Sequence, residues 1–75
     1  MTIQIFVKTY IGQITKTITI DCDTSDTILE TKQKISTKLD IPCDRIRLTF
    51  CSRTLENNKK INDYNIGKES TLYAY

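Results

Sequence analysis

Apolar and polar side chains alternate along the first third of the chain with the period of two that a half-buried β-strand shows. Residues 3–8 carry isoleucine or valine at every odd position, and residues 17–22 repeat the alternation after a turn that Gly12 marks. A short connection that contains glycine is typical of a β-hairpin, and the dense isoleucine and threonine content favours strands. The chain is therefore predicted to begin with a hairpin.

The period then changes to that of a helix. Thr27 and Glu30 have the spacing of a capping box, which satisfies two backbone amides at a helix start. Leu29 is expected to be exposed, Asp40 to end the helix, and Pro42 to prevent it from resuming. The side chains at helical spacing that we expect to face a sheet are Ile28, Thr31, Ile35 and Leu39.

Three further strands and a short helical turn are predicted in the second half. Turns are expected at Cys51-Ser52 and at Asn57-Asn58, where asparagine tolerates the left-handed conformation. The predicted strands are residues 46–50, 53–55 and 71–75, and the helical turn is residues 61–64.

These elements predict an α+β fold with one helix across one face of a mixed sheet. Since 75 residues form a single core, we expect one domain spanning residues 1–75. Consecutive strands can pair as hairpins, and a crossover lets the first and last strands lie parallel at the centre. The prediction is a β-grasp fold, with four to five strands packed on one α-helix.

The composition argues against catalysis and metal binding. The chain has no histidine, so no Cys–His or Ser–His pair exists, and its three cysteines are fewer than the four ligands of a structural zinc site. No paired-carboxylate cleft or phosphate-binding glycine loop is visible, and we expect neither enzymatic activity nor a cofactor. The cysteines are expected to be reduced thiols of a cytoplasmic or nuclear protein, with Cys22 in the core.

The charge pattern and hydropathy argue against nucleic acid and a membrane as partners. The net charge is +2, and Lys59-Lys60 is the only adjacent basic pair, without interleaved aromatic residues. No apolar run approaches the roughly 20 residues of a membrane span, and the start of the chain does not suggest a signal peptide. We expect a monomer that binds neither nucleic acid nor membranes.

Nearly the whole chain resembles the ubiquitin family. The resemblance is carried by residues 4–9, 16–19, 25–28, 41–42, 47–48 and 55–56, and by Asp63-Tyr64-Asn65-Ile66 and Lys68-Glu69-Ser70-Thr71-Leu72. It implies the β-grasp fold and a protein modifier that is conjugated to other proteins through isopeptide bonds. Three departures concern the fold: a hairpin turn about three residues longer, with Gln13-Ile14-Thr15 as the insertion, Thr31 where the family buries valine, and Asp40 where it uses glycine.

A further departure concerns the apolar patch on which the family's partners dock. The resemblance places this patch at Tyr10, Thr49, Tyr73 and Tyr75, beside Arg47. Thr49 replaces the patch's central isoleucine, and losing a buried aliphatic group at an interface costs about 1–3 kcal/mol, enough to abolish weak docking. Two interpretations of the tyrosines stay open: a different adhesive surface, or edge-strand residues with their hydroxyls in water.

The lysines also follow the family. The residues that match its acceptor positions are Lys8, Lys16, Lys32, Lys34, Lys38 and Lys68, and Arg53 takes the place of the lysine that carries the main degradative linkage. An arginine stays protonated, so no isopeptide bond is expected at Arg53. Each lysine can equally be a solvated charge that maintains solubility.

The family's chain runs on for about six residues to a double glycine, whereas this sequence is written to Tyr75. As written, we expect that the chain cannot be activated for conjugation. Two functions remain: a modifier-type unit of a longer precursor or tandem array, or a non-covalent interaction module with an altered, tyrosine-rich patch.

Overall fold

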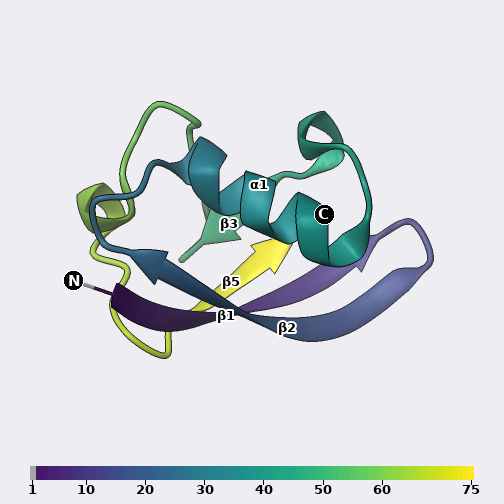
Figure 1. The fold of residues 1–75 in the computed structure, drawn as a ribbon, viewed down its shortest axis with the longest axis horizontal. Helices are drawn as coiled ribbons and strands as arrows, with labels where there is room; N and C mark the ends of the chain where they lie inside the picture. Colours follow the sequence, from purple (N-terminus) through teal and green to yellow (C-terminus); the bar gives the residue numbers. More distant parts are fainter. Residues whose placement is uncertain (1) are drawn as a thin grey trace.

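The protein is described here by a computed structural model of residues 2–75 (Figure 1). One helix, five strands and two single-turn 3₁₀ helices follow one another as predicted, apart from the first 3₁₀ turn, which the sequence analysis missed. The elements are β1 (Thr2–Ile11), β2 (Ile14–Asp23), α1 (Ile28–Leu39), η1 (Cys43–Arg45), β3 (Leu48–Phe50), β4 (Arg53–Thr54), η2 (Ile61–Tyr64) and β5 (Thr71–Ala74).

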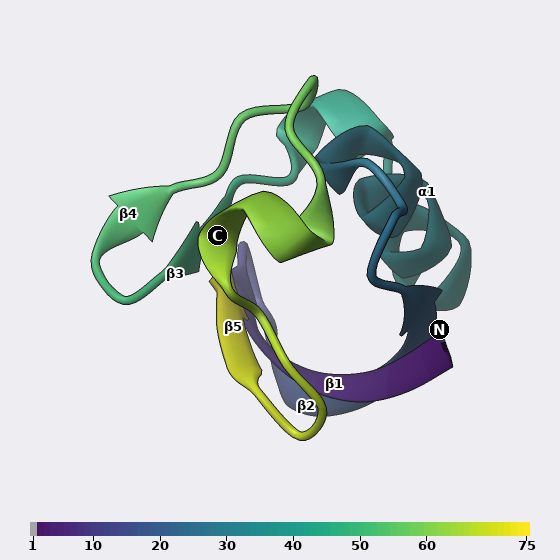
Figure 2. The ribbon, with the colours of Figure 1, turned by 90° about the vertical axis from the view of Figure 1, so that its left-hand side faces the viewer.

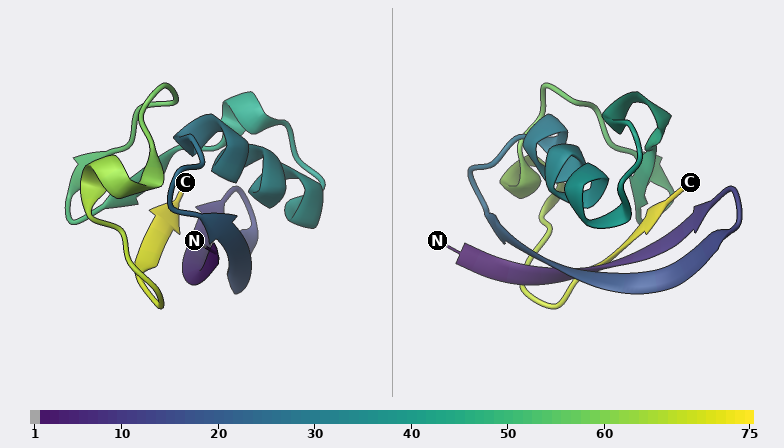
Figure 3. Two further views of the ribbon diagram at one scale, coloured as in Figure 1. Left: turned by 60° about the vertical axis from the view of Figure 1, so that its left-hand side comes forward. Right: turned by 45° about the vertical axis from the view of Figure 1, so that its right-hand side comes forward.

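The five strands form one mixed sheet in the order β2-β1-β5-β3-β4. β1 and β5 run parallel at its centre, while the other neighbouring pairs are antiparallel. The sheet curls beneath α1, which lies on its concave side (Figures 2 and 3). This arrangement confirms the α+β, β-grasp prediction. Among residues 2–75, no helix has both the length and the apolar character that crossing a bilayer requires.

The first hairpin differs from its prediction. Its strands pair over their whole length, from Thr2 opposite Asp23 to Ile11 opposite Ile14, and only two residues form the turn. Gly12 takes the positive φ of 58° that a type II′ turn requires at its first central position. The predicted longer turn was wrong, because Ile14 and Thr15 continue the alternation and pair with β1. The additional residues lengthen the two strands instead.

The predicted ends of α1 are confirmed. The Thr27 hydroxyl accepts a hydrogen bond from the Glu30 amide, and the Thr27 amide donates to the Glu30 carboxylate, both at 3.2 Å. Asp40 is left-handed, with φ of 56°, and its amide donates to the Ser36 carbonyl. A left-handed non-glycine residue strains the backbone by roughly 1 kcal/mol.

The two predicted turns after β3 both exist, but the left-handed conformation that was expected to suit Asn57-Asn58 occurs at Cys51-Ser52 instead. Asn57 and Asn58 form a turn without positive φ. Cys51 and Ser52 are the left-handed pair, with φ of 52° and 65°, because a two-residue hairpin of this kind matches the twist of its strands.

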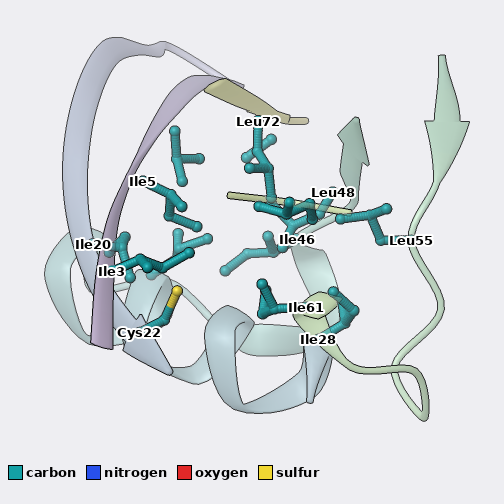
Figure 4. Packing of buried hydrophobic residues seen from close by; sticks show 14 of the residues in the cluster. Ile3, Ile5, Ile20, Cys22, Ile28, Ile46, Leu48, Leu55, Ile61 and Leu72 are labelled. Atoms are coloured by element: carbon teal, nitrogen blue, oxygen red, sulfur yellow. The ribbon is translucent and has the colours of Figure 1, made fainter. Parts of the chain in front are cut away.

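The core lies between the concave face of the sheet and α1 (Figure 4). Cys22 is 1% exposed within it, as predicted. Thr31 is fully buried, and its hydroxyl donates at 3.2 Å to the Thr27 carbonyl, which also accepts from the Thr31 amide. Thr9 is a second buried hydroxyl, which the sequence analysis missed, and it donates to the Lys16 carbonyl at 2.6 Å. No buried side-chain oxygen or nitrogen of residues 2–75 lacks a partner.

Candidate protein-interaction face

The convex face of the sheet points away from α1 and carries the predicted patch. Alternation along β5 turns Leu72 and Ala74 into the core and leaves Tyr73 43% exposed. The register then fixes its neighbours, since Tyr73 lies opposite Lys8 of β1 on one side and Thr49 of β3 on the other. The centre of this face is therefore a row of three side chains from three different strands.

Tyr73 also contacts Tyr10, which lies two residues beyond Lys8 on the same face of β1. The two rings are stacked with their centroids 6.4 Å apart and their planes 17° apart. The Lys8 ammonium lies 5.9 Å from the centroid of the Tyr73 ring, within the range of a cation–π contact. Such contacts restrict the side chains, so the rings form an ordered aromatic surface beside a positive charge.

Arg47 and Tyr75 extend the same surface beyond Thr49 and Tyr73, each two residues away along the chain. The Arg47 amide donates to the Tyr75 carbonyl at 2.8 Å, and the Tyr75 amide donates to the Arg47 carbonyl at 2.9 Å. This pair continues the antiparallel ladder of β3 and β5, so strand alternation places both residues on the face of Thr49 and Tyr73. We call this surface the tyrosine face; its residues are Lys8, Tyr10, Arg47, Thr49, Tyr73 and Tyr75.

The structure thus brings together all five residues that the sequence analysis assigned to the patch. It corrects the interpretation of the tyrosines as edge-strand residues, because β1 and β5 are interior strands and the edges are β2 and β4. The sequence analysis named Lys8 only as a possible acceptor. Its place two residues before Tyr10 indicated the shared face, but its position against Tyr73 depends on the strand register.

The predicted acceptor lysines differ in their surroundings. Within residues 2–75, the ammonium groups of Lys16, Lys38 and Lys68 are exposed and make no hydrogen bond or ion pair. Lys34 forms an ion pair with Asp26 at 3.0 Å, and Lys32 is half-buried and donates to the Asn57 side-chain oxygen at 2.7 Å. Arg53 is exposed in β4.

Two carboxylates organise the connection from β2 to α1. The amide and hydroxyl of Ser25 donate to Asp23, and these hydrogen bonds are the largest of the causes that lower the pKa of Asp23 to about 2. The Asp23 amide donates in turn to Asp26, which lowers the pKa of Asp26, with help from Lys34. Burial raises the pKa of the Cys22 thiol, as for an unreactive core cysteine. No group of three or more acidic or cysteine side chains among residues 2–75 could hold a metal ion.

The sequence model described as the ubiquitin family matches residues 5–75, nearly the whole chain. The chain belongs to the ubiquitin family. Domains of the ubiquitin family are generally non-enzymatic and act through contacts with other proteins. In this member of the ubiquitin family, the tyrosine face is an ordered, exposed surface that is suited to such contacts.

Proposed function

We propose that this ubiquitin-like domain is a modifier-type unit that proteins recognise through the tyrosine face. Large aromatic side chains are favoured anchors at protein interfaces, and here three of them are 55%, 43% and 49% exposed at Tyr10, Tyr73 and Tyr75. The observation that carries the proposal is the stack of Tyr10 on Tyr73 with Lys8 beside it, because ordered rings lose little further freedom on binding.

The modifier role extends to conjugation and to a place in a longer precursor or tandem array, in the cytoplasm or nucleus. Its support is the family membership over residues 5–75. Lys16, Lys38 and Lys68 are the best acceptor candidates, since their ammonium groups are exposed and make no bond within the described residues. Lys34 and Lys32 are less available, because each already donates to a neighbour.

The conjugation role is tested with the family's flexible double-glycine ending added after Tyr75. The extended protein is incubated with ubiquitin-activating enzyme and ATP, and thioester formation is measured on a non-reducing gel. We expect a thioester, because the chain belongs to the ubiquitin family over residues 5–75 and the added ending supplies the flexible carboxyl end that activation needs. If no thioester forms while ubiquitin itself is charged in parallel, the modifier role is wrong.

The alternative function is a non-covalent interaction module that keeps the fold and binds proteins without conjugation. The specific observation in its favour is Thr49, which lies opposite Tyr73 at the centre of the tyrosine face and presents a hydroxyl where the family has an aliphatic side chain. Such a change favours partners that differ from those of ubiquitin.

The variant Thr49→Ile tests whether the tyrosine face is the family's binding patch without its central aliphatic group, or a surface that binds in a different way. The added aliphatic group should restore binding to ordinary ubiquitin-binding domains, with a gain of about 1–3 kcal/mol. Titration of the labelled variant with such a domain, followed by NMR, should shift the amides of residue 49 and of Tyr73. The absence of any shift would mean that the tyrosines have replaced the family's binding mode altogether.

A further inference from the structure

A hollow on the surface lies between α1, η1 and the segment that leads into β3, next to the tyrosine face at Arg47. It is a hollow of about 370 Å³, and the residues of its lining that matter here are Leu29, Lys32, Asp44, Ile46, Arg47 and Asn57. Its lining combines apolar and positively charged side chains, and the proposed function of the tyrosine face makes no use of it. We call it the Lys32 hollow.

The central feature of the Lys32 hollow is a half-buried lysine whose ammonium has no anionic partner within residues 2–75. Lys32 donates to the neutral side-chain oxygen of Asn57 at 2.7 Å, and it forms no ion pair within residues 2–75. Two residues further along the helix, Lys34 shows the usual arrangement, with the Asp26 carboxylate at 3.0 Å. A cation that is partly removed from water and meets only a neutral amide gains from any anion that reaches it.

A second cation lines the same hollow. Burial is the main cause that lowers the pKa of Lys32. The nearby charge of Arg47 lowers this pKa further, although Cys43 opposes the shift. Asp44 is the one carboxylate among the residues that line the hollow. Two cations against one carboxylate leave the hollow with an excess of positive charge, which attracts acidic groups and repels basic ones.

The apolar part of the lining defines what accompanies the acidic group. Leu29 is 40% exposed on the first turn of α1, where the helix otherwise presents polar side chains to solvent. Ile46 forms part of the floor and is almost fully buried. When a carboxylate of a partner protein pairs with Lys32 and Arg47, a neighbouring side chain of that partner would therefore lie over Leu29.

We propose that the Lys32 hollow binds an acidic segment of a partner protein, in which a glutamate or aspartate side chain pairs with Lys32 and Arg47 and a neighbouring apolar side chain covers Leu29. The choice of occupant rests on charge complementarity and on the apolar residue beside the two cations. The site is distinct from the tyrosine face and shares only Arg47 with it, so either can fail without the other.

The probe is the blocked peptide acetyl-Gly-Glu-Leu-Glu-Gly-amide, titrated into the labelled protein and followed by NMR. We expect amide shifts that cluster at Leu29, Lys32 and Asn57 and that shrink as salt is added. The matching peptide with glutamine in place of both glutamates should cause no such shifts. Shifts of equal size with the neutral peptide, or shifts confined to the tyrosine face, would overturn the proposal.

Two substitutions on α1 test whether the ammonium is responsible. Lys32→Gln should weaken peptide binding by about tenfold, the usual scale of one charge-assisted hydrogen bond. Lys38→Gln removes an equal charge from an exposed position of the same helix and should change binding less than twofold, by ordinary screening. Equal weakening by both variants would reduce the effect to net charge and refute the site.

Asn57→Asp provides a test that does not depend on removing Lys32. The Asn57 side-chain oxygen is 2.7 Å from the Lys32 ammonium, so the new carboxylate would form an ion pair with Lys32 within the protein and compete with the peptide. Peptide binding should fall about as far as in Lys32→Gln, while the urea midpoint stays the same or rises. Unchanged peptide affinity in a folded Asn57→Asp protein would contradict the proposal. Tyr73→Ala should leave binding in the Lys32 hollow intact, which separates this result from the function of the tyrosine face.

Discussion

The two faces of β5 place neighbouring residues under opposite constraints. Leu72 and Ala74 are fully buried against the core, whereas Tyr73 and Tyr75 are 43% and 49% exposed on the other side of the same strand. The buried positions on the concave face are apolar except for Thr9, while the convex face carries tyrosines, threonines and cations. A single backbone thus serves packing on one side and, in the proposed function, recognition on the other.

This division explains how the convex face can depart from the family without loss of the fold. Substituting a buried side chain removes apolar contact area and leaves a cavity, so the concave face tolerates little change. The convex side chains contact one another and water, so their exchange should cost little stability. The sheet therefore holds Tyr10, Thr49 and Tyr73 in register whatever residues occupy those positions.

The largest expected effect comes from truncating neighbours on the two faces of β5. Leu72→Ala should destabilise the protein by about 2–5 kcal/mol, since it empties a fully buried position. Tyr73→Ala removes a stacked but exposed ring and should cost about 1 kcal/mol or less. Urea unfolding followed by circular dichroism measures both. Similar losses for the two variants would show that the tyrosine face carries part of the folding energy.

A smaller change in stability is expected from substitutions that alter only the backbone conformation and lie on neither face of the sheet. Asp40→Gly relieves a left-handed residue and should stabilise the protein by about 0.5–1 kcal/mol. Gly12→Ala is the reciprocal change, and it should destabilise by about 1 kcal/mol although an added Cβ meets no atom within 4 Å. Thermal unfolding of the pair should move the midpoints in opposite directions; shifts of the same sign would contradict the role given to φ.

The sequence predicted the concave face better than the convex face, for a physical reason. Alternation and helical spacing depend on neighbouring residues, so the burial of Ile5, Cys22 and Thr31 could be predicted without knowing which strands meet. The stack of Tyr10 on Tyr73 depends on the parallel register of β1 and β5. This pairing brings together residues that are more than sixty positions apart in the sequence. Composition does not determine that register.

The first hairpin and Lys32 show the same limit. An insertion near Gly12 was visible in the sequence, but whether it widens the turn or lengthens the strands depends on whether the new residues pair. Likewise, Lys32 and Lys34 look alike as helix-surface lysines. One meets Asp26 and the other Asn57, because different segments lie beside each position in three dimensions.

The buried hydroxyl of Thr31 is a polar exception on the concave side, and its removal should have a small effect. Its hydroxyl donates to a carbonyl that already accepts from the Thr31 amide, so no buried group loses its only partner in Thr31→Val. The added methyl should stabilise the protein by roughly 0.5 kcal/mol. Thr49→Val on the convex face is the matched control, and it should change stability less. Clear destabilisation by Thr31→Val would show that the hydroxyl bond contributes more than the methyl group.

The smallest effect is expected at the polar connection between β2 and α1, which belongs to neither face. The pKa of Asp23 is lowered to about 2 in the folded protein, and an unfolded aspartate titrates near pH 4. The folded state therefore binds fewer protons than the unfolded state in this range, and stability should fall as the pH drops from about 4 to about 2. Above this window the contribution is fully present.

Asp23→Asn should flatten the dependence of the unfolding free energy on pH between about 4 and about 2, measured by urea unfolding at several pH values. Asp44→Asn removes the same charge from an exposed position in η1 and is the control. Equal flattening in both variants would mean that net charge, and not the Ser25 hydrogen bonds, sets the acid sensitivity.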